Sequence, residues 1–351
     1  MSDVSELSHN RIPSLSGVRG VAVLVVLMSH TSNHGLYLLP GFSLSGAGRY
    51  GVYLFFVLSA FLLTRQFLVN KSRSERYSEF LSNYFKRRFL RIFPLFIVSL
   101  CVYWLYSVVS GNSLYITGVE KFFKHLFLLE GVGIFWTIPV EFKYYFLLPL
   151  VAWFFSTDRF SALIKTGGGL VLMLICYPGT PVFNGSLMPF LGMFLSGSFA
   201  AWISVWLERK SINSLGVLFE ILGWCSAVSF FLLSPDILNL LFEGARYTRT
   251  YFHDQLLFFS LVSVFFIFGS LYGLGGLRKV MSSRFFMFLG EISFSLYLWH
   301  IIILKLWLSL GWLEESFVGF TVLFILVLMC SFVSYTRLEL PCQNNALLNS
   351  C

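Results

Sequence analysis

Apolar segments long enough to cross a lipid bilayer recur along almost the whole sequence. The hydrocarbon core of a bilayer needs about 20 mostly apolar residues in a helix, because each residue adds only about 1.5 Å. With 57% hydrophobic and 12% charged residues, the chain has too little polar surface for a soluble globular domain. The sequence therefore predicts an all-α, polytopic integral membrane protein of about ten transmembrane helices: 17–39, 50–69, 92–110, 136–156, 162–178, 187–206, 214–233, 255–275, 285–310 and 316–336.

The distribution of basic residues predicts the orientation of these helices. If the N-terminus is cytoplasmic, most of the 25 Lys and Arg residues fall in cytoplasmic segments, as the positive-inside rule requires. We therefore expect both termini in the cytoplasm, with a short tail at 1–16, a membrane domain at 17–336 and a tail at 337–351. The net charge of +8 reflects topology and not nucleic-acid binding, because the basic residues form no soluble basic domain.

The six cysteines show no C-x-x-C spacing, so the sequence predicts no metal site and no redox motif, and they read as free thiols. The polar N-terminal stretch MSDVSELSHNRIPSLSG lacks the pattern of a removable signal peptide.

Arg19 and His30 are ionisable residues in the first predicted helix, where such groups are expensive and usually face a polar cavity or a partner. They are eleven residues apart, which is nearly three helical turns, so both side chains point the same way about 16 Å apart. One helix thus offers an anion-binding group at its cytoplasmic entrance and a titratable base further in. A plainer interpretation remains open at this point: Arg19 as a topological anchor and His30 as a packed, hydrogen-bonded histidine.

Glu141 lies about five residues into the fourth predicted helix from its non-cytoplasmic end. This depth resembles that of His30, so the sequence allows a His–carboxylate pair in which Glu141 orients the imidazole. An ion pair with Lys143, or a hydrogen bond to a tyrosine such as Tyr145, fits the sequence equally well.

The loop between the second and third predicted helices is strongly basic. Arg87 and Arg91, four residues apart in YFKRRFLRIFP, share a helical face where the chain enters the membrane. Guanidinium groups in this arrangement are suited to clamp the phosphates of a nucleotide-bearing donor. The alternative is a positive-inside loop that touches anionic lipid. The basic residues concerned are Arg65, Lys71, Arg73, Arg76, Lys86, Arg87, Arg88 and Arg91.

Six segments, in register along almost the whole chain, resemble one family of membrane enzymes. The segments are SLSGVRGVAVLVVLMSH with its Arg and His eleven residues apart, GVYLFFVLSAFLLTRQF, YFKRRFLRIFPLF, WTIPVEFKYYFLLP, ISFSLYLWH and the closing RLELP. Each is a weak pattern alone, but together they resemble the acyltransferase-3 family of membrane-bound O-acyltransferases. One departure is Ala60, which stands where the family has a glycine after the Leu-Ser of its second helix.

The resemblance implies a ten-helix enzyme of the inner membrane that takes acyl-CoA, commonly acetyl-CoA, from the cytoplasm. The implied acceptor is a hydroxyl of a glycan such as the O-antigen of lipopolysaccharide or an exopolysaccharide, of a lipid-linked sugar, or of a small metabolite. On the matching positions, His30 becomes the catalytic base, Glu141 a second site residue, and Arg19, Arg87 and Arg91 the groups that bind the donor phosphates. The role of His300 stays open, and Ser59, Tyr297 and Trp299 remain alternatives for the oxyanion donor.

Two other classes of function remain to be separated from this one. A transporter or flippase for a lipid-linked sugar would also carry intramembrane charges, although the sequence has no inverted repeat that we detect. A binding or structural membrane protein would leave the Arg19–His30 spacing as coincidence. Turnover of acyl-CoA discriminates the acyltransferase from both. Direct transfer is favoured over an acyl-enzyme, since no serine or cysteine has a visible base beside it.

Overall fold

A computed structural model describes residues 12–38, 42–70, 77–111, 114–177, 183–210, 214–242, 247–248, 250, 252–311 and 317–348, and these residues form helices and connecting segments without a β-strand. The longer helices are α2 (Pro13–Ser32), α3 (Gly48–Asn70), α4 (Tyr77–Ser110), α6 (Thr137–Ser156), α7 (Ala162–Ile175), α8 (Leu191–Arg209), α9 (Gly216–Leu232), α11 (Leu256–Tyr272), α14 (Ser293–Ser309) and α15 (Phe317–Ser334). The shorter elements are α5 (Gly118–Leu126), α10 (Pro235–Leu241), α12 (Gly276–Met281), α13 (Arg284–Glu291) and α16 (Leu340–Leu348), with turns η1 (Gly133–Trp136), η2 (Met188–Phe190) and η3 (Tyr335–Glu339).

The all-helical, membrane-spanning class that the sequence predicts is confirmed. Among the described residues, 6 helices are long and apolar enough to cross a membrane, or up to 8 if each of two bent helix pairs is one span. The pairs are α9 with α10, bent by 91°, and α13 with α14, bent by 75°. Two further apolar helices, α7 and α11, are shorter than a full span. Each of the ten predicted segments coincides with one of these helices, but length and composition support six to eight spans, and ten remains a prediction.

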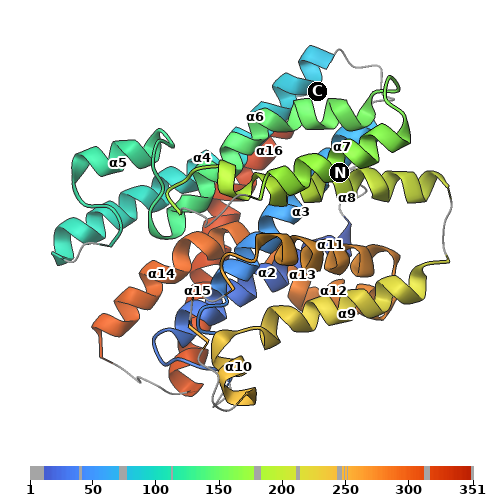
Figure 1. Ribbon diagram of the computed structural model, residues 1–351. Coiled ribbons are helices and arrows are strands. Elements are labelled where there is room, and N and C mark those ends of the chain that lie inside the picture. The colour runs from blue at the N-terminus through green and yellow to red at the C-terminus, as the bar shows by residue number, and fades with distance from the viewer. Residues whose placement is uncertain are drawn as a thin grey trace.

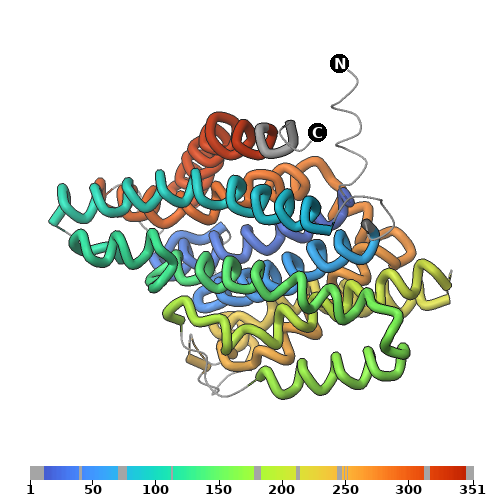
Figure 2. Tube along the Cα trace, turned by 90° about the horizontal axis from the view of Figure 1, so that it is seen from above, coloured from blue at the N-terminus to red at the C-terminus, as the bar shows by residue number. Residues whose placement is uncertain are grey.

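The helices α2 and α3 lie at the centre of the bundle. Figure 2 shows them between one layer containing α4 and α15 and another containing α7, α8 and α9. In their apolar spans, 78% of the α2 residues and 67% of the α3 residues are buried, against 33% in α4. Arg19 and His30 lie on α2, and the LFFVLSAF segment lies on α3. Both helices are therefore core elements that the other helices surround (Figure 1).

Glycines allow α2 to pack directly on the backbone of α12 and α13. A Cβ added to Gly17 would lie 1.8 Å from the carbonyl oxygen of Met281, and one added to Gly290 would lie 1.8 Å from that of Ser16. Small residues at such positions let helices approach closely in a membrane, where van der Waals packing drives their association. At another close contact, Ala60 of α3 fits because α8 presents Gly197, whose added Cβ would lie 3.0 Å from that of Ala60.

We expect Gly290→Ala to destabilise the protein by about 1–3 kcal/mol, because the new methyl group overlaps a backbone oxygen that cannot move alone. Thermal unfolding of the purified protein in detergent measures this loss. Gly167→Ala is the matched control, since this helical glycine has nothing within 4 Å of an added Cβ. That variant should be as stable as the parent or up to about 1 kcal/mol more stable. Equal stability of the two variants would contradict the proposed packing role.

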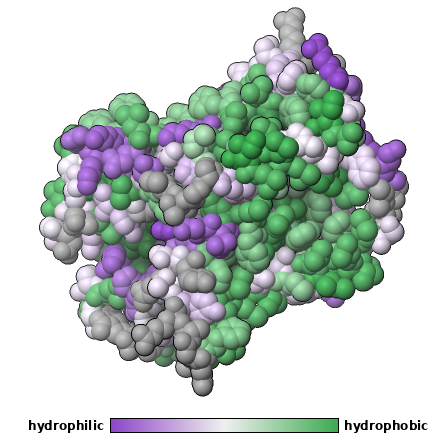
Figure 3. Space-filling model, viewed as in Figure 1, coloured by the Kyte–Doolittle hydropathy of each residue, from purple (hydrophilic) through white to green (hydrophobic). Residues whose placement is uncertain are grey.

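The outer surface of the bundle suits contact with lipid. Figure 3 shows a broad hydrophobic surface bordered by hydrophilic residues at the left edge, where α5 lies, and at the right edge, where α8 ends. Large apolar side chains such as Leu163, Ile175 and Val109 are exposed on the helices themselves. A soluble protein rarely exposes so much continuous apolar surface.

Several element boundaries differ from those that the sequence predicts. The third predicted helix begins at Tyr77 instead of residue 92, because polar and basic residues continue the same helix beyond the apolar span. The segment 285–310 is not one straight helix but the bent pair α13 and α14. The predicted C-terminal tail at 337–351 is helical as far as Leu348, through the π-helical turn η3 and α16. Residues 1–11 of the predicted N-terminal tail lie outside the described residues.

Candidate functional site

A cavity of about 480 Å³ opens among α2, α3, α4, α6 and the segment from α13 to α16. Apolar residues of α3 form part of its lining, and the polar part of the lining is rich in ionisable groups. Ile12, the first described residue, and Gln343 of α16 both contribute to it, so the start of α2 and the start of α16 lie at the same end of the bundle. The ionisable lining residues that concern the chemistry are Arg19, Arg65, Arg88, Arg91, Glu141 and Glu339.

Three of the cavity's arginines form one group, which we call the inner arginines: Arg19 of α2 and Arg88 and Arg91 of α4. Arg19 lies within electrostatic range of Arg88, Arg91 and Glu141. Within the described part of the chain, the buried Nε of Arg88 has no hydrogen-bond partner. Clustered cations with an unused donor are a favourable setting for an anionic ligand.

The structure places the predicted pair, Arg87 and Arg91, in different surroundings. Arg91 lines the cavity, but its companion on that face is Arg88, and Arg87 does not belong to the lining. The Nε of Arg87 donates to the carbonyl oxygen of Asn83 on its own helix, 3.1 Å away. Spacings of three and four residues both bring side chains to one helical face, so α4 could turn either arginine inward.

Glu141 lines the same cavity on α6 and is held by two hydroxyl groups. Its Oε1 accepts hydrogen bonds from Ser59 Oγ at 2.6 Å and from Tyr145 OH at 2.5 Å. The tyrosine alternative is therefore the one observed, and the predicted His–carboxylate pair is not formed because His30 is bonded elsewhere. Lys143, the other alternative partner, points away and donates to the carbonyl oxygen of Gly185 at 2.8 Å.

Glu339 is a cavity residue that the sequence analysis did not single out. It is 3% exposed, accepts from Ser295 Oγ at 2.9 Å and from Gln343 Nε2 at 3.1 Å, and lies within electrostatic range of Arg91 and Arg19. It ends the π-helical turn η3, and Pro341 follows two residues later without an N–H for the usual helical bond. The sequence signal for this residue was the closing RLELP segment, which contains Glu339 but does not indicate that its side chain points into the cavity.

His30 and His300 form a direct pair between α2 and α14. The Nδ1 of His30 lies 2.8 Å from the Nε2 of His300, and the rings stack with centroids 5.0 Å apart. His300 is 1% exposed, whereas His30 is half-buried. The sequence singled out both histidines but gave no reason to join them, since 270 residues separate them.

The hydrogen bonds of the pair assign the tautomers of the two neutral rings. The Nδ1 of His300 lies 3.2 Å from the carbonyl oxygen of Leu296, which can only accept, so this nitrogen carries the proton. The Nε2 of His300 is then an acceptor, and the Nδ1 of His30 donates to it. The lone pair then lies on the Nε2 of His30, which has no hydrogen-bond partner among the described residues and can take a proton from an incoming group.

Tyr297 connects the cavity with the histidine pair. It lines the cavity, whereas neither histidine does, and its ring centroid is 5.9 Å from that of His300. Its hydroxyl donates to the carbonyl oxygen of Ile134 at 2.7 Å and accepts from Thr137 Oγ1 at 3.2 Å. Arg19 and His30 lie at different depths, about 16 Å apart along α2. Tyr297 lines the cavity and contacts His300, which in turn contacts His30.

The three alternatives for an oxyanion donor differ in their hydrogen bonds. Ser59 donates its proton to Glu141, and Tyr297 donates to Ile134. Trp299 has a buried Nε1 that finds no hydrogen-bond partner among the described residues. Of the three, the indole N–H alone is uncommitted in this structure.

The sequence is similar to those of several proteins named as acetyltransferases. The peptidoglycan O-acetyltransferase OatA of Listeria monocytogenes is 24% identical over 387 aligned positions, which cover 99% of this chain and 58% of that protein. A putative acetyltransferase, ORF330, of Acidianus two-tailed virus is 27% identical over 86% of each chain. The O-acetyltransferase OatA of Staphylococcus aureus is 23% identical over 84% of this chain and 50% of that protein.

The chain thus spans between half and three-fifths of the length of the OatA proteins it matches. No solved structure matches it significantly. The model of a family described as an acyltransferase domain matches residues 12–336, which include Arg19, His30, Arg88, Arg91, Glu141 and His300. This match over nearly the whole length identifies the chain as a member of the acyltransferase-3 family.

Proposed function

We propose that this protein is an O-acetyltransferase of the inner membrane that moves an acetyl group from acetyl-CoA to a sugar hydroxyl of a surface polysaccharide. The observation that carries the proposal is a cavity whose lining includes a group of arginines. Tyr297 lines another part of the same cavity, and the His30–His300 pair lies next to Tyr297. A phosphate-bearing donor and a base are the two requirements of this reaction.

In the proposed donor complex, the inner arginines bind the phosphates of CoA and the pantetheine arm extends along the apolar residues of α3 toward Tyr297. Guanidinium groups bind phosphate oxygens in bidentate geometry, and the low dielectric of the membrane interior strengthens these contacts. Glu339 and Glu141 balance part of the positive charge before the donor arrives.

In the proposed chemical step, the Nε2 of His30 removes the proton of the acceptor hydroxyl as its oxygen attacks the thioester carbonyl carbon. The new C–O bond forms, the C–S bond breaks, and the CoA thiolate leaves and takes the proton back from His30. His300 holds His30 in the required tautomer by accepting from its Nδ1. His30 is half-buried outside the cavity lining, which leaves it a second face for the acceptor.

The acceptor is proposed from chemistry and likeness together. One relative is named as a peptidoglycan O-acetyltransferase, so a cell-wall or surface glycan is the acceptor class to test first. The O-antigen of lipopolysaccharide, an exopolysaccharide and a lipid-linked sugar present the same kind of hydroxyl group and remain within the proposal.

The first test follows acetyl groups labelled in acetyl-CoA into the glycan and lipid-linked fractions of membranes that carry this protein. We expect label in one of these fractions, and none with His30→Ala. Label that stays in acetyl-CoA although both proteins are inserted and bind CoA would contradict the proposal. It would favour a transporter or flippase of a lipid-linked sugar, which needs no acyl turnover.

We expect Arg88→Gln and Arg91→Gln each to weaken CoA binding about tenfold or more, because each removes a charge-assisted contact at a partly desolvated site. Calorimetry or equilibrium binding of labelled CoA to the purified protein measures the change. Arg87→Gln is the matched control from the same helix and should leave the affinity nearly unchanged. A larger loss of CoA affinity for Arg87→Gln than for Arg88→Gln would instead favour the pair of Arg87 and Arg91 that the sequence predicts.

A further inference from the structure

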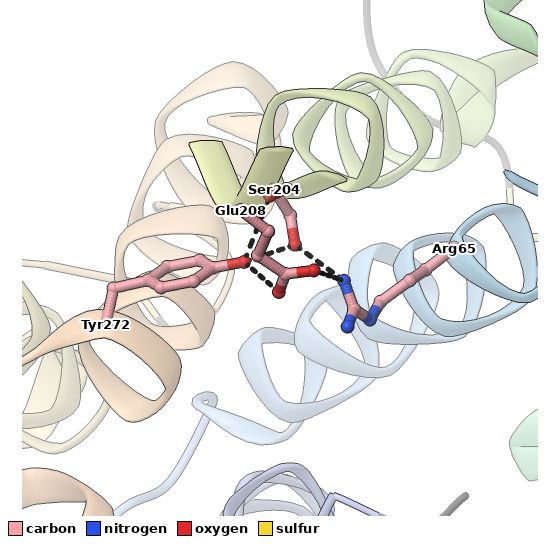
Figure 4. A network of polar contacts seen from close by, with 4 residues as sticks. All are labelled: Arg65, Ser204, Glu208 and Tyr272. Atoms are coloured by element: carbon pink, nitrogen blue, oxygen red, sulfur yellow. Dashed lines mark hydrogen bonds and ion pairs between the residues drawn. The ribbon is translucent and has the colours of Figure 1, made fainter. Parts of the chain in front are cut away.

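A fourth arginine, Arg65, occupies a separate part of the cavity, on α3. Figure 4 shows it held by residues of two other helices, Ser204 and Glu208 of α8 and Tyr272 of α11. The Nη1 of Arg65 donates to Ser204 Oγ at 3.2 Å and to Glu208 Oε2 at 2.9 Å. Tyr272 OH donates to the other carboxylate oxygen of Glu208 at 2.8 Å. Arg65 is thus tied to a carboxylate through a network of three helices.

This network fixes the guanidinium plane while it uses one nitrogen. Both bonds to α8 come from Nη1, so among the described residues the edge formed by Nη2 and Nε has no hydrogen-bond partner. That edge presents two parallel N–H donors, the geometry that binds a phosphate or carboxylate. The side chain of Arg65 is 21% exposed and lines the cavity, which makes it accessible to a ligand there.

Arg65 of α3 lies closer to the cytoplasmic side than Arg88 and Arg91 of α4 do. Phe67 of α3 packs against Phe80 and Tyr84 of α4, with ring centroids 4.8 and 5.1 Å apart, which sets the relative depth of the two helices. From that level, at 1.5 Å per residue, Arg65 is about 3 Å deeper and Arg88 about 9 Å deeper. The exposed Val69, one turn beyond Arg65, also lines the cavity and marks its opening.

We propose that Arg65 forms a second anion subsite at the cavity mouth, which binds the ribose 3′-phosphate of CoA while the inner arginines bind the pyrophosphate. This inference rests on the proposed donor and adds the group that distinguishes CoA from nucleotides without a 3′-phosphate. Two cationic subsites at different depths match a ligand with two separated anionic groups. Glu208 and Tyr272 are positioning residues, because they orient Arg65 without reaching the ligand.

The test compares binding of CoA and of 3′-dephospho-CoA to the purified full chain in phosphatidylcholine nanodiscs. We expect the parent to prefer CoA about tenfold or more. Arg65→Gln should remove this preference and leave the affinity for 3′-dephospho-CoA nearly unchanged. Arg91→Gln should instead weaken both ligands by similar factors and keep the preference. An unchanged preference in Arg65→Gln, or an equal loss of both ligands, would overturn the subsite.

Further variants separate binding by Arg65 from a structural role. Arg65→Lys keeps the charge but not the fork, so an intermediate preference is expected. Tyr272→Phe removes the hydroxyl that holds Glu208 and should lower the preference for CoA by a smaller factor than Arg65→Gln. Arg284→Gln changes an exposed arginine outside the cavity lining and should bind both ligands as the parent does.

The remaining outcomes also decide the matter. A lipid headgroup carries the same phosphate chemistry, so the comparison is repeated with phosphatidylglycerol in the nanodiscs. Two results together would overturn the CoA subsite in favour of a lipid subsite. The parent would show no preference for CoA in phosphatidylcholine, and it would bind phosphatidylglycerol more tightly in a way that Arg65→Gln abolishes. A parent protein that binds neither nucleotide would overturn the proposed donor as well, whereas normal binding of both with equal affinity would overturn the subsite alone.

Discussion

Replacing His30 with alanine is expected to lower the rate of acyl transfer by about 10²–10⁴-fold, the range typical of losing a general base. The Nε2 of His30 is the one nitrogen of the histidine pair that the hydrogen bonds leave with an available lone pair. Without it, the acceptor hydroxyl must lose its proton to water at a site inside a membrane protein. Single-turnover transfer of labelled acetyl to the acceptor fraction measures this chemical step directly.

Donor binding supplies the control for this prediction. His30 does not line the cavity, so His30→Ala should bind CoA with nearly the affinity of the parent and elute as the same folded species. His34→Ala removes an exposed histidine one turn further along the chain and should transfer acetyl groups at close to the normal rate. Transfer by His30→Ala within tenfold of the parent would rule out His30 as the base and leave it a packing residue.

The sequence predicted the parts of the site that depend on position along one helix. Arg19 and His30 lie on one continuous helix, α2, and the regular rise of that helix sets their separation. Arg91 lies inside the cavity, as its place at the entry of α4 suggested. Apolar length located the membrane helices for the same reason, because a spanning segment must be apolar wherever it packs.

Contacts between helices could not be predicted in the same way. The choice between Arg87 and Arg88 depends on which face α4 turns toward the cavity, and the spacing of arginines within the local sequence allows either. The His30–His300 contact joins helices that are far apart in the sequence, and α14, which carries His300, follows a 75° bend from α13. No proline marks that bend; Ser293 Oγ donates to the carbonyl oxygen of Gly290 there, at 2.8 Å.

His300→Leu is expected to lower the turnover rate about five- to hundredfold, because it breaks a buried hydrogen bond worth about 1–3 kcal/mol. With His300 absent, the Nδ1–H of His30 has lost the acceptor that fixes its tautomer, and the proton can move to the Nε2 that must act as base. The turnover number should fall while the KM for acetyl-CoA changes little, since the donor arginines are untouched. Steady-state kinetics with a saturating acceptor separate the two quantities.

His300→Gln distinguishes orientation of His30 from simple packing at this position. The amide oxygen of glutamine extends about as far as the Nε2 of histidine and can accept from the Nδ1 of His30, so this variant should recover much of the rate that His300→Leu loses. The effect of His300→Leu on the rate should also vanish when His30 is already alanine, because the effects of substituting residues that act as a unit are not additive. Equal losses of activity in His300→Leu and His300→Gln would mean that His300 stabilises the helix contact and does not orient the base. The same conclusion would follow if His300→Leu slowed the residual reaction of His30→Ala by the same factor as it slows the reaction of the parent.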